Sequence, residues 1–138
     1  MPKGSRVFVV DDDPSARKGL ARLLRTAGHE VHDFASAEEF LGILDPECAL
    51  DPDTFACLIL DARMPGLSGQ ELLTELKKRG VRLPVIMVTA EDDLLTRKTA
   101  QAMNAAAFFR KPVDGTALLD AIDWAMRSER RARGNNSD

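Results

Sequence analysis

Carboxylates, a hydroxyl and a lysine follow four short apolar runs of this 138-residue chain. The run RVFVV is followed by Asp11 and Asp12, CLIL by Asp61, VIMV by Thr89, and the run that ends in FFR by Lys111. Short apolar runs bounded by turn residues are typical of buried strands. Because the carboxyl ends of parallel strands meet at one edge of a sheet, these side chains can converge.

Converging carboxylates predict a particular chemistry. Three carboxylates close together repel one another at neutral pH and require a cation. Their oxygen atoms suit a hard divalent ion such as Mg²⁺, and Mn²⁺ is a substitute that accepts the same ligands. Lys111 adds a positive charge and Thr89 a hydrogen-bond donor, the groups that stabilise the oxygens of a phosphoryl group. Asp61 is then the candidate nucleophile that takes the phosphoryl group as an acyl phosphate.

Periodicity and capping residues predict the elements that position these groups. Strands are predicted over residues 6–10, 30–34, 57–61, 84–88 and 107–110. Helices are predicted over residues 14–28, 36–44, 68–80, 92–103 and 114–124, and within the last of them Trp124 is interpreted as a packing residue. Strands that alternate with helices favour an α/β fold, a doubly wound parallel sheet of five strands with five helices on its two faces.

Composition limits the classes of function. The chain is long enough for one domain with a core of its own, and no second domain is predicted. A net charge of −3 argues against direct nucleic-acid binding by this segment. No apolar run approaches the ~20 residues of a membrane span, and the N-terminus does not resemble a signal peptide. Cys48 and Cys57 make neither a disulfide framework nor a metal cluster, so a cytoplasmic location is expected.

The four runs together resemble the receiver domain of two-component response regulators. The matching segments are VVDDDPSAR at 9–17, LILDARMPG at 58–66, VTA at 88–90 and FFRKP at 108–112. The resemblance implies a flavodoxin-like sheet with strand order 2-1-3-4-5 in a receiver domain over residues 1–127. Residues 128–138 are then expected to be a flexible tail or the stub of a linker. The form that these four segments take in this chain is most similar to that of receivers that carry helix-turn-helix output domains.

The resemblance assigns a role to each residue of the acidic site. Asp61 is implied as the phosphoacceptor. Asp12 is implied as a direct Mg²⁺ ligand and Asp11 as one that acts largely through water. Together with Asp61, the backbone carbonyl of Arg63 would complete the protein ligands. Arg63 and Glu91 flank the path of attacking water, and we expect them to tune the lifetime of the phosphoryl group.

Further positions match the switch of the family. Thr89 is implied as the switch hydroxyl and Lys111 as its partner at the phosphoryl group, with a cis peptide bond between Lys111 and Pro112. Phe108 stands at the aromatic switch position, where it has no hydroxyl, so that its inward movement would depend on burial alone. Asn104 replaces the usual glycine, a replacement that the left-handed region tolerates.

The expected function is a phosphorylation-dependent switch. A histidine kinase or phosphotransfer protein would donate a phosphoryl group to Asp61, and the surface of the fourth helix, fifth strand and fifth helix would change to control an output domain or partner. The chain would catalyse only its own phosphorylation and dephosphorylation and is not expected to be an enzyme. A phosphorylation-dependent homodimer through the fourth and fifth helices is an alternative that the sequence neither requires nor excludes.

Three other functions share parts of this pattern. Haloacid-dehalogenase-type phosphatases also use a strand-end Asp with Mg²⁺, but they need a second Asp where this chain has Arg63. A pseudo-receiver that only binds proteins would normally have lost one of the acidic pair, the acceptor Asp or the Lys, and all are present. A flavodoxin-like cofactor binder would need a hydroxyl- or Gly-rich phosphate loop after the first strand, and none follows it.

Overall fold

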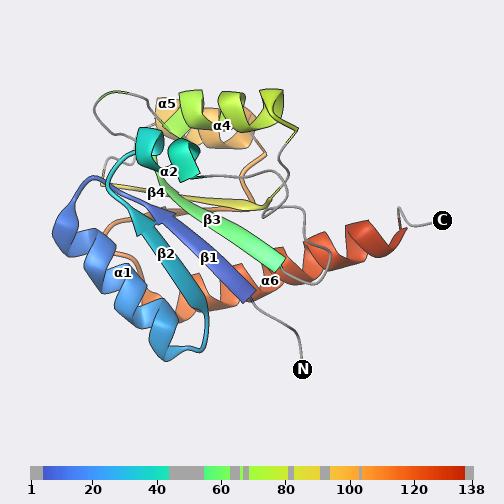
Figure 1. Cartoon of the computed structure of the whole chain (residues 1–138), viewed down its shortest axis with the longest axis horizontal. Helices are drawn as coiled ribbons and strands as arrows, with labels where there is room; N and C mark the ends of the chain where they lie inside the picture. The colour runs from blue at the N-terminus through green and yellow to red at the C-terminus, as the bar shows by residue number, and fades with distance from the viewer. Residues whose placement is uncertain are drawn as a thin grey trace.

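A computed structural model of the chain describes residues 5–43, 55–62, 66, 69–80, 83–90, 94–102 and 104–135 (Figure 1). Within these residues five strands alternate with five helices. The strands are β1 (Ser5–Val10), β2 (Glu30–Phe34), β3 (Phe55–Asp61), β4 (Val85–Thr89) and β5 (Ala107–Arg110). The helices are α1 (Pro14–Thr26), α2 (Ala37–Ile43), α4 (Gly69–Lys78), α5 (Leu94–Ala102) and α6 (Gly115–Asn135).

The strands form one parallel sheet in the order β2-β1-β3-β4-β5, which confirms the predicted fold. β1 lies between β2 and β3, and its last residue, Val10, pairs with Phe34 on one side and Leu60 on the other. Because β1 and β3 are neighbours, the residues at their carboxyl ends also lie side by side. In open parallel sheets, ligands bind at the carboxyl edge between the two strands where the strand order reverses, and here these strands are β1 and β3.

Strand side chains alternate between two apolar layers, one on each face of the sheet. Phe8 and Val10 belong to the layer that includes Phe40 of α2 and further residues of α4 and α5. Val7 and Val9 belong to the layer formed with α1 and α6. Figure 1 shows the same division, with α2, α4 and α5 on one side of the sheet and α1 and α6 on the other. The sheet is therefore held from both faces, and its carboxyl edge stays available for polar groups.

Helix ends follow several of the predicted signals. The Asp13 carboxylate accepts a hydrogen bond from the Ser15 amide at 3.1 Å and caps α1. The Glu39 amide donates to Ser36 Oγ at 3.1 Å at the start of α2. Asn104 has a φ of 60°, so it occupies the left-handed region expected after α5. Four residues at predicted helix ends lie outside the described residues: Leu44, Ser68, Asp92 and Met103.

The end predicted for the last helix is wrong, because α6 continues past Trp124 to Asn135. The segment from Ser128, expected as a flexible tail, is therefore helical over most of its length. No Gly or Pro interrupts residues 116–133, which are rich in Ala and Arg, both good helix formers. Figure 1 shows the C-terminal part of α6 extending beyond the sheet. A charged composition is thus compatible with a continuous helix here.

The packing role predicted for Trp124 is also wrong, because its side chain is 60% exposed. The buried stripe of α6 contains Leu118, Ile122 and Ala125, at helical spacing. Trp124 follows Ile122 by two residues, a separation that places two side chains on different sides of a helix.

Among the described helices, none combines the length and the apolar character needed to cross a membrane.

Candidate functional site

The predicted site residues lie at the carboxyl ends of four strands. Asp61 and Thr89 are the last residues of β3 and β4, whereas Asp11 and Lys111 directly follow β1 and β5. Sheet hydrogen bonds continue past the strand ends, because the Asp11 amide donates to the Phe34 carbonyl at 3.1 Å and the Lys111 amide to the Thr89 carbonyl at 2.8 Å. The backbone of Asp11 and of Lys111 is therefore fixed by the sheet itself.

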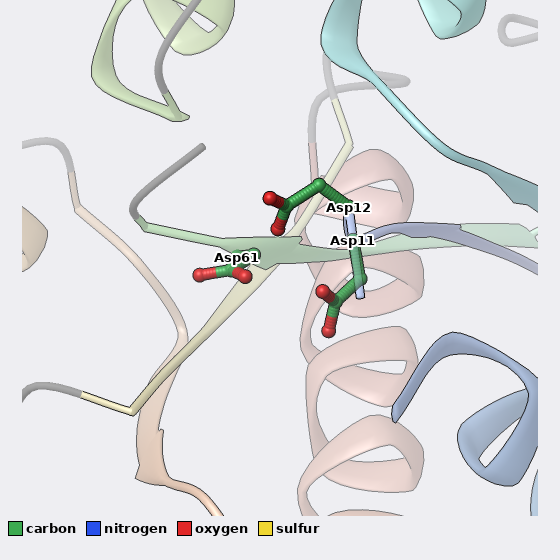
Figure 2. A group of neighbouring side chains, drawn as sticks. All are labelled: Asp11, Asp12 and Asp61. Carbon is green, nitrogen blue, oxygen red and sulfur yellow. The ribbon is translucent and has the colours of Figure 1, made fainter. Parts of the chain in front are cut away.

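The carboxylates of Asp11, Asp12 and Asp61 come together as predicted. Oxygen atoms from the three side chains all lie within 4.8 Å of one another. Figure 2 shows them where β1 and β3 end. Asp11 is fully buried and Asp61 is 5% exposed, while Asp12 is open to solvent. Buried carboxylates are costly unless charge or hydrogen bonds compensate them, so the groups around them decide whether the site is tolerated.

Lys111 supplies part of that compensation. Its Nζ lies 2.8 Å from Asp11 Oδ2 and 3.1 Å from Asp61 Oδ2, so one ammonium group bridges the two buried carboxylates. Burial alone would lower the pKa of Lys111, but the close contacts with Asp11 and Asp61 and their negative charge outweigh it and raise that pKa above its usual value. The ammonium group therefore stays charged throughout the physiological pH range.

The two oxygens of the Asp11 carboxylate have different partners. Oδ1 accepts a hydrogen bond from the Asp13 amide at 2.9 Å. Oδ2 is buried and forms the ion pair with Lys111 at 2.8 Å. One ammonium group thus faces three carboxylates, so negative charge remains in excess at the site. Oxygen ligands with an excess of negative charge fit a divalent ion such as Mg²⁺.

Arg17 of α1 is a positioning residue that the sequence reasoning missed. Its guanidinium donates to the Asp11 carbonyl at 2.9 Å and to Asp33 Oδ2 of β2 at 3.2 Å, and its side chain is 15% exposed. The sequence does offer one signal for this role. A cation near the N-terminus of a helix opposes the helix dipole, so another interaction must stabilise it there.

Gly69, the first residue of α4, is a second residue whose role was missed. A Cβ atom at this position would lie 2.9 Å from the Asp61 carbonyl oxygen and 3.3 Å from the Ala62 Cα. These are backbone atoms at the carboxyl end of β3 and directly after it, so they cannot rotate aside as a side chain can. Only glycine lets α4 begin this close to Asp61.

The switch positions occupy the neighbouring strands. Thr89 is fully buried, and Phe108 is half-buried and packs against the layer that contains Met87. Phe108 pairs with Met87 in the register of β4 and β5. Because alternate residues of a strand share a face, Thr89 lies on the same face as Met87, diagonally next to Phe108. The peptide bond between Lys111 and Pro112 is cis.

Two predicted residues lie outside the described part of the structure. They are Arg63, expected to offer a backbone carbonyl and to tune the phosphoryl lifetime, and Glu91, expected to share that second role.

Comparison with known proteins agrees with this geometry. The family model described as the response regulator receiver domain matches residues 7–123. Nodulation protein W of Bradyrhizobium diazoefficiens is 39% identical over 127 residues, which cover 92% of this chain and 53% of that protein. The transcriptional regulatory protein FixJ of Azorhizobium caulinodans is 40% identical over 134 residues, 96% of this chain and 61% of that protein. The chain thus spans between half and two thirds of these curated relatives.

Solved structures show the same arrangement. The response regulator StyR superposes with a TM-score of 0.82 at 40% identity, over 97% of this chain and 66% of that one. A CheY-like receiver domain protein from Methanospirillum hungatei superposes with a TM-score of 0.79 at 26% identity, over 94% of this chain and 99% of that one. The likeness therefore extends over nearly the whole of the present chain.

The contact at Gly69 predicts an unusual response to alanine. Gly69→Ala is expected to lower the free energy of unfolding by ~1–3 kcal/mol, because the new methyl group meets backbone. Gly42→Ala in α2 is the matched control, since nothing lies within 4 Å of the position that its methyl group would take, and it should raise stability by up to ~1 kcal/mol. Urea denaturation measures both. If Gly69→Ala is as stable as the unsubstituted chain, the close approach is incorrect.

The acidic cluster predicts stabilisation by Mg²⁺. Binding to the folded state alone should raise the midpoint of thermal unfolding, by the equivalent of ~2.7 kcal/mol at about 100 times Kd. Asp12→Asn should weaken this effect strongly. Asp13→Asn should preserve it, because Asn also caps helices and the Asp13 carboxylate caps α1. Differential scanning calorimetry measures the unfolding midpoint of each variant with and without Mg²⁺. If Mg²⁺ raises the midpoint equally in the two variants, Asp12 is not a ligand of the ion.

Proposed function

The chain belongs to the response regulator receiver domain family, and from that premise we propose that it accepts a phosphoryl group on Asp61 from a histidine kinase or phosphotransfer protein. Membership makes it the receiver domain of a two-component response regulator, in a family that is not one of classical enzymes. The observation that carries the proposal is the geometry around Asp61. Its carboxylate lies within 4.8 Å of two others and 3.1 Å from the Lys111 ammonium.

The proposed reaction is a transfer of one phosphoryl group. An oxygen of the Asp61 carboxylate attacks the phosphorus of a phosphohistidine, and a new O–P bond forms as the P–N bond breaks. The imidazole leaves with the electron pair of the broken bond and takes up a proton. Lys111, already beside Asp61, is placed to pair with an oxygen of the incoming group. In the free protein the same ammonium orients the nucleophile.

Four groups would hold the metal ion. Asp12 and Asp61 are proposed as direct ligands, Asp11 as a ligand largely through water, and the Arg63 carbonyl as the remaining protein ligand. When bound, Mg²⁺ or Mn²⁺ supplies positive charge beside the phosphoryl oxygens. The convergence of three carboxylates beside a single ammonium group supports this proposal.

Phosphorylation is proposed to act through Thr89 and Phe108. The Thr89 hydroxyl moves toward the phosphoryl group, and the Phe108 ring then occupies space near the vacated position on the same face. The surface formed by α5, β5 and α6 changes as a result and controls an output domain or a partner, which includes a second copy of the chain in a homodimer. Phosphorylation can shift this equilibrium only by the difference in its interactions with the two states.

The remaining parts of the protein's role are inferred from its relatives. The chain spans 61% of a relative named a transcriptional regulatory protein, which favours an output in transcription. With a net charge of −3, this segment is not proposed to bind nucleic acid directly. It is proposed to act in the cytoplasm, where its kinase would present the phosphoryl group.

Acetyl phosphate tests the proposed reaction. Incubation with acetyl phosphate and Mg²⁺ should give a single phosphoryl adduct in the intact mass spectrum, because a small acyl phosphate can replace phosphohistidine as the donor. The adduct should be absent without Mg²⁺ and in Asp61→Asn, whose fold is verified by circular dichroism. If the unsubstituted chain forms no adduct at any Mg²⁺ concentration, it is a pseudo-receiver that only binds proteins.

Charge at residues 63 and 91 is proposed to govern the lifetime of the adduct. Arg63→Ala and Glu91→Ala should each change the rate of autodephosphorylation by about threefold or more, since side chains beside the path of water can shield or steer it. Lys98→Ala removes an exposed charge of α5 that is not part of the acidic cluster, and it should leave the rate unchanged. Loss of the adduct is followed by mass spectrometry after removal of the donor. Unchanged rates in both variants would contradict the proposal.

A further inference from the structure

The guanidinium of Arg97 lies over the aromatic ring of Phe108. Its central carbon is 5.6 Å from the ring centroid, within the range of a cation–π interaction. Arg97 belongs to α5 and is exposed, whereas Phe108 belongs to β5 and is half-buried. The contact therefore joins a charged side chain at the surface to the ring proposed to move when Asp61 is phosphorylated.

The Phe108 ring is in contact with packed residues and also borders an open recess. It packs against the apolar layer of the sheet that contains Met87. The recess has a volume of about 200 Å³ and is lined by Arg97, Ala100, Gln101, Ala105, Ala107 and Phe108 itself. Three of the lining residues are alanines, which reach only a short distance. A small interaction with the guanidinium can therefore influence where the ring lies.

We propose that Arg97 is a positioning residue that holds Phe108 in its unphosphorylated position and so opposes phosphorylation of Asp61. The inference rests on the proposed function, in which the ring moves inward toward Thr89. That movement takes the ring away from a guanidinium that is exposed and would have to lose water to follow it. The contact belongs to one state of the switch and stabilises that state only.

Linkage gives the direction of the effect. Any interaction that stabilises the unphosphorylated arrangement must weaken, by the same factor, the binding of a phosphoryl group that requires the other arrangement. Phe108 has no hydroxyl to form a hydrogen bond in its inward position. The balance between the two ring positions therefore depends on burial and on contacts such as the one with Arg97.

Beryllium fluoride tests this inference, because with Mg²⁺ it binds a carboxylate noncovalently in place of a phosphoryl group. Its apparent dissociation constant is measured on the ¹⁵N-labelled full chain from the amide signals at the site. Arg97→Gln should lower this constant by about two- to fivefold, the value expected for loss of an exposed cation–π contact. In a Phe108→Leu background the same substitution should have no effect.

Lys98→Gln is the matched control, since it removes an equal charge from the adjacent exposed residue of α5. Loss of positive charge by itself should weaken the binding of an anionic group, which is opposite to the effect expected at Arg97. A chain that does not bind beryllium fluoride at all overturns the proposed function and this inference together. If the chain binds beryllium fluoride but Arg97→Gln changes the dissociation constant as Lys98→Gln does, the inference alone is overturned. The same holds if Arg97→Gln has an equal effect in the Phe108→Leu background.

Discussion

One ammonium group set among three carboxylates is the interaction on which the rest of the structure depends. Lys111 contacts Asp11 and Asp61 at 2.8 and 3.1 Å, and both carboxylates are almost completely buried. Removing one partner of a buried ion pair is generally far more costly than its net contribution suggests, because the other charge is left uncompensated. The excess of negative charge beyond that of Lys111 favours a divalent cation at this edge of the sheet.

The fold holds these charges mainly through its backbone. The order of the strands places β1 beside β3, and hydrogen bonds beyond the strand ends fix Asp11 and Lys111. Arg17 binds the carbonyl of Asp11 from α1, and Gly69 lets α4 begin against the carbonyl of Asp61. Both helices thus support the site without placing a side chain among the carboxylates. Such support keeps Asp11 and Asp61 in fixed positions, as efficient transfer to the proposed acceptor would require.

Local patterns were sufficient to predict the strands and the residues at their ends. A buried strand that ends in Asp61 is evident from four apolar residues, and parallel strands bring their carboxyl ends together whatever their partners are. Arg17 and Gly69 were missed because their roles depend on contacts between elements distant in the sequence. The length of α6 was mispredicted because a charged segment was interpreted as a tail, and the exposure of Trp124 because its two-residue separation from Ile122 was overlooked. The contact of Arg97 with Phe108 is likewise a product of tertiary packing.

The central claim, that this edge of the sheet exists to place a phosphoryl group on Asp61, is tested most directly by locating that group. Borohydride reduces an aspartyl phosphate to homoserine, a permanent change that tandem mass spectrometry assigns to one residue. After treatment with phosphodonor and Mg²⁺, the account predicts homoserine at position 61 and aspartate at positions 11 and 12. Homoserine at either of those positions, or a phosphoryl group on another residue while Asp61 stays unmodified, would contradict it.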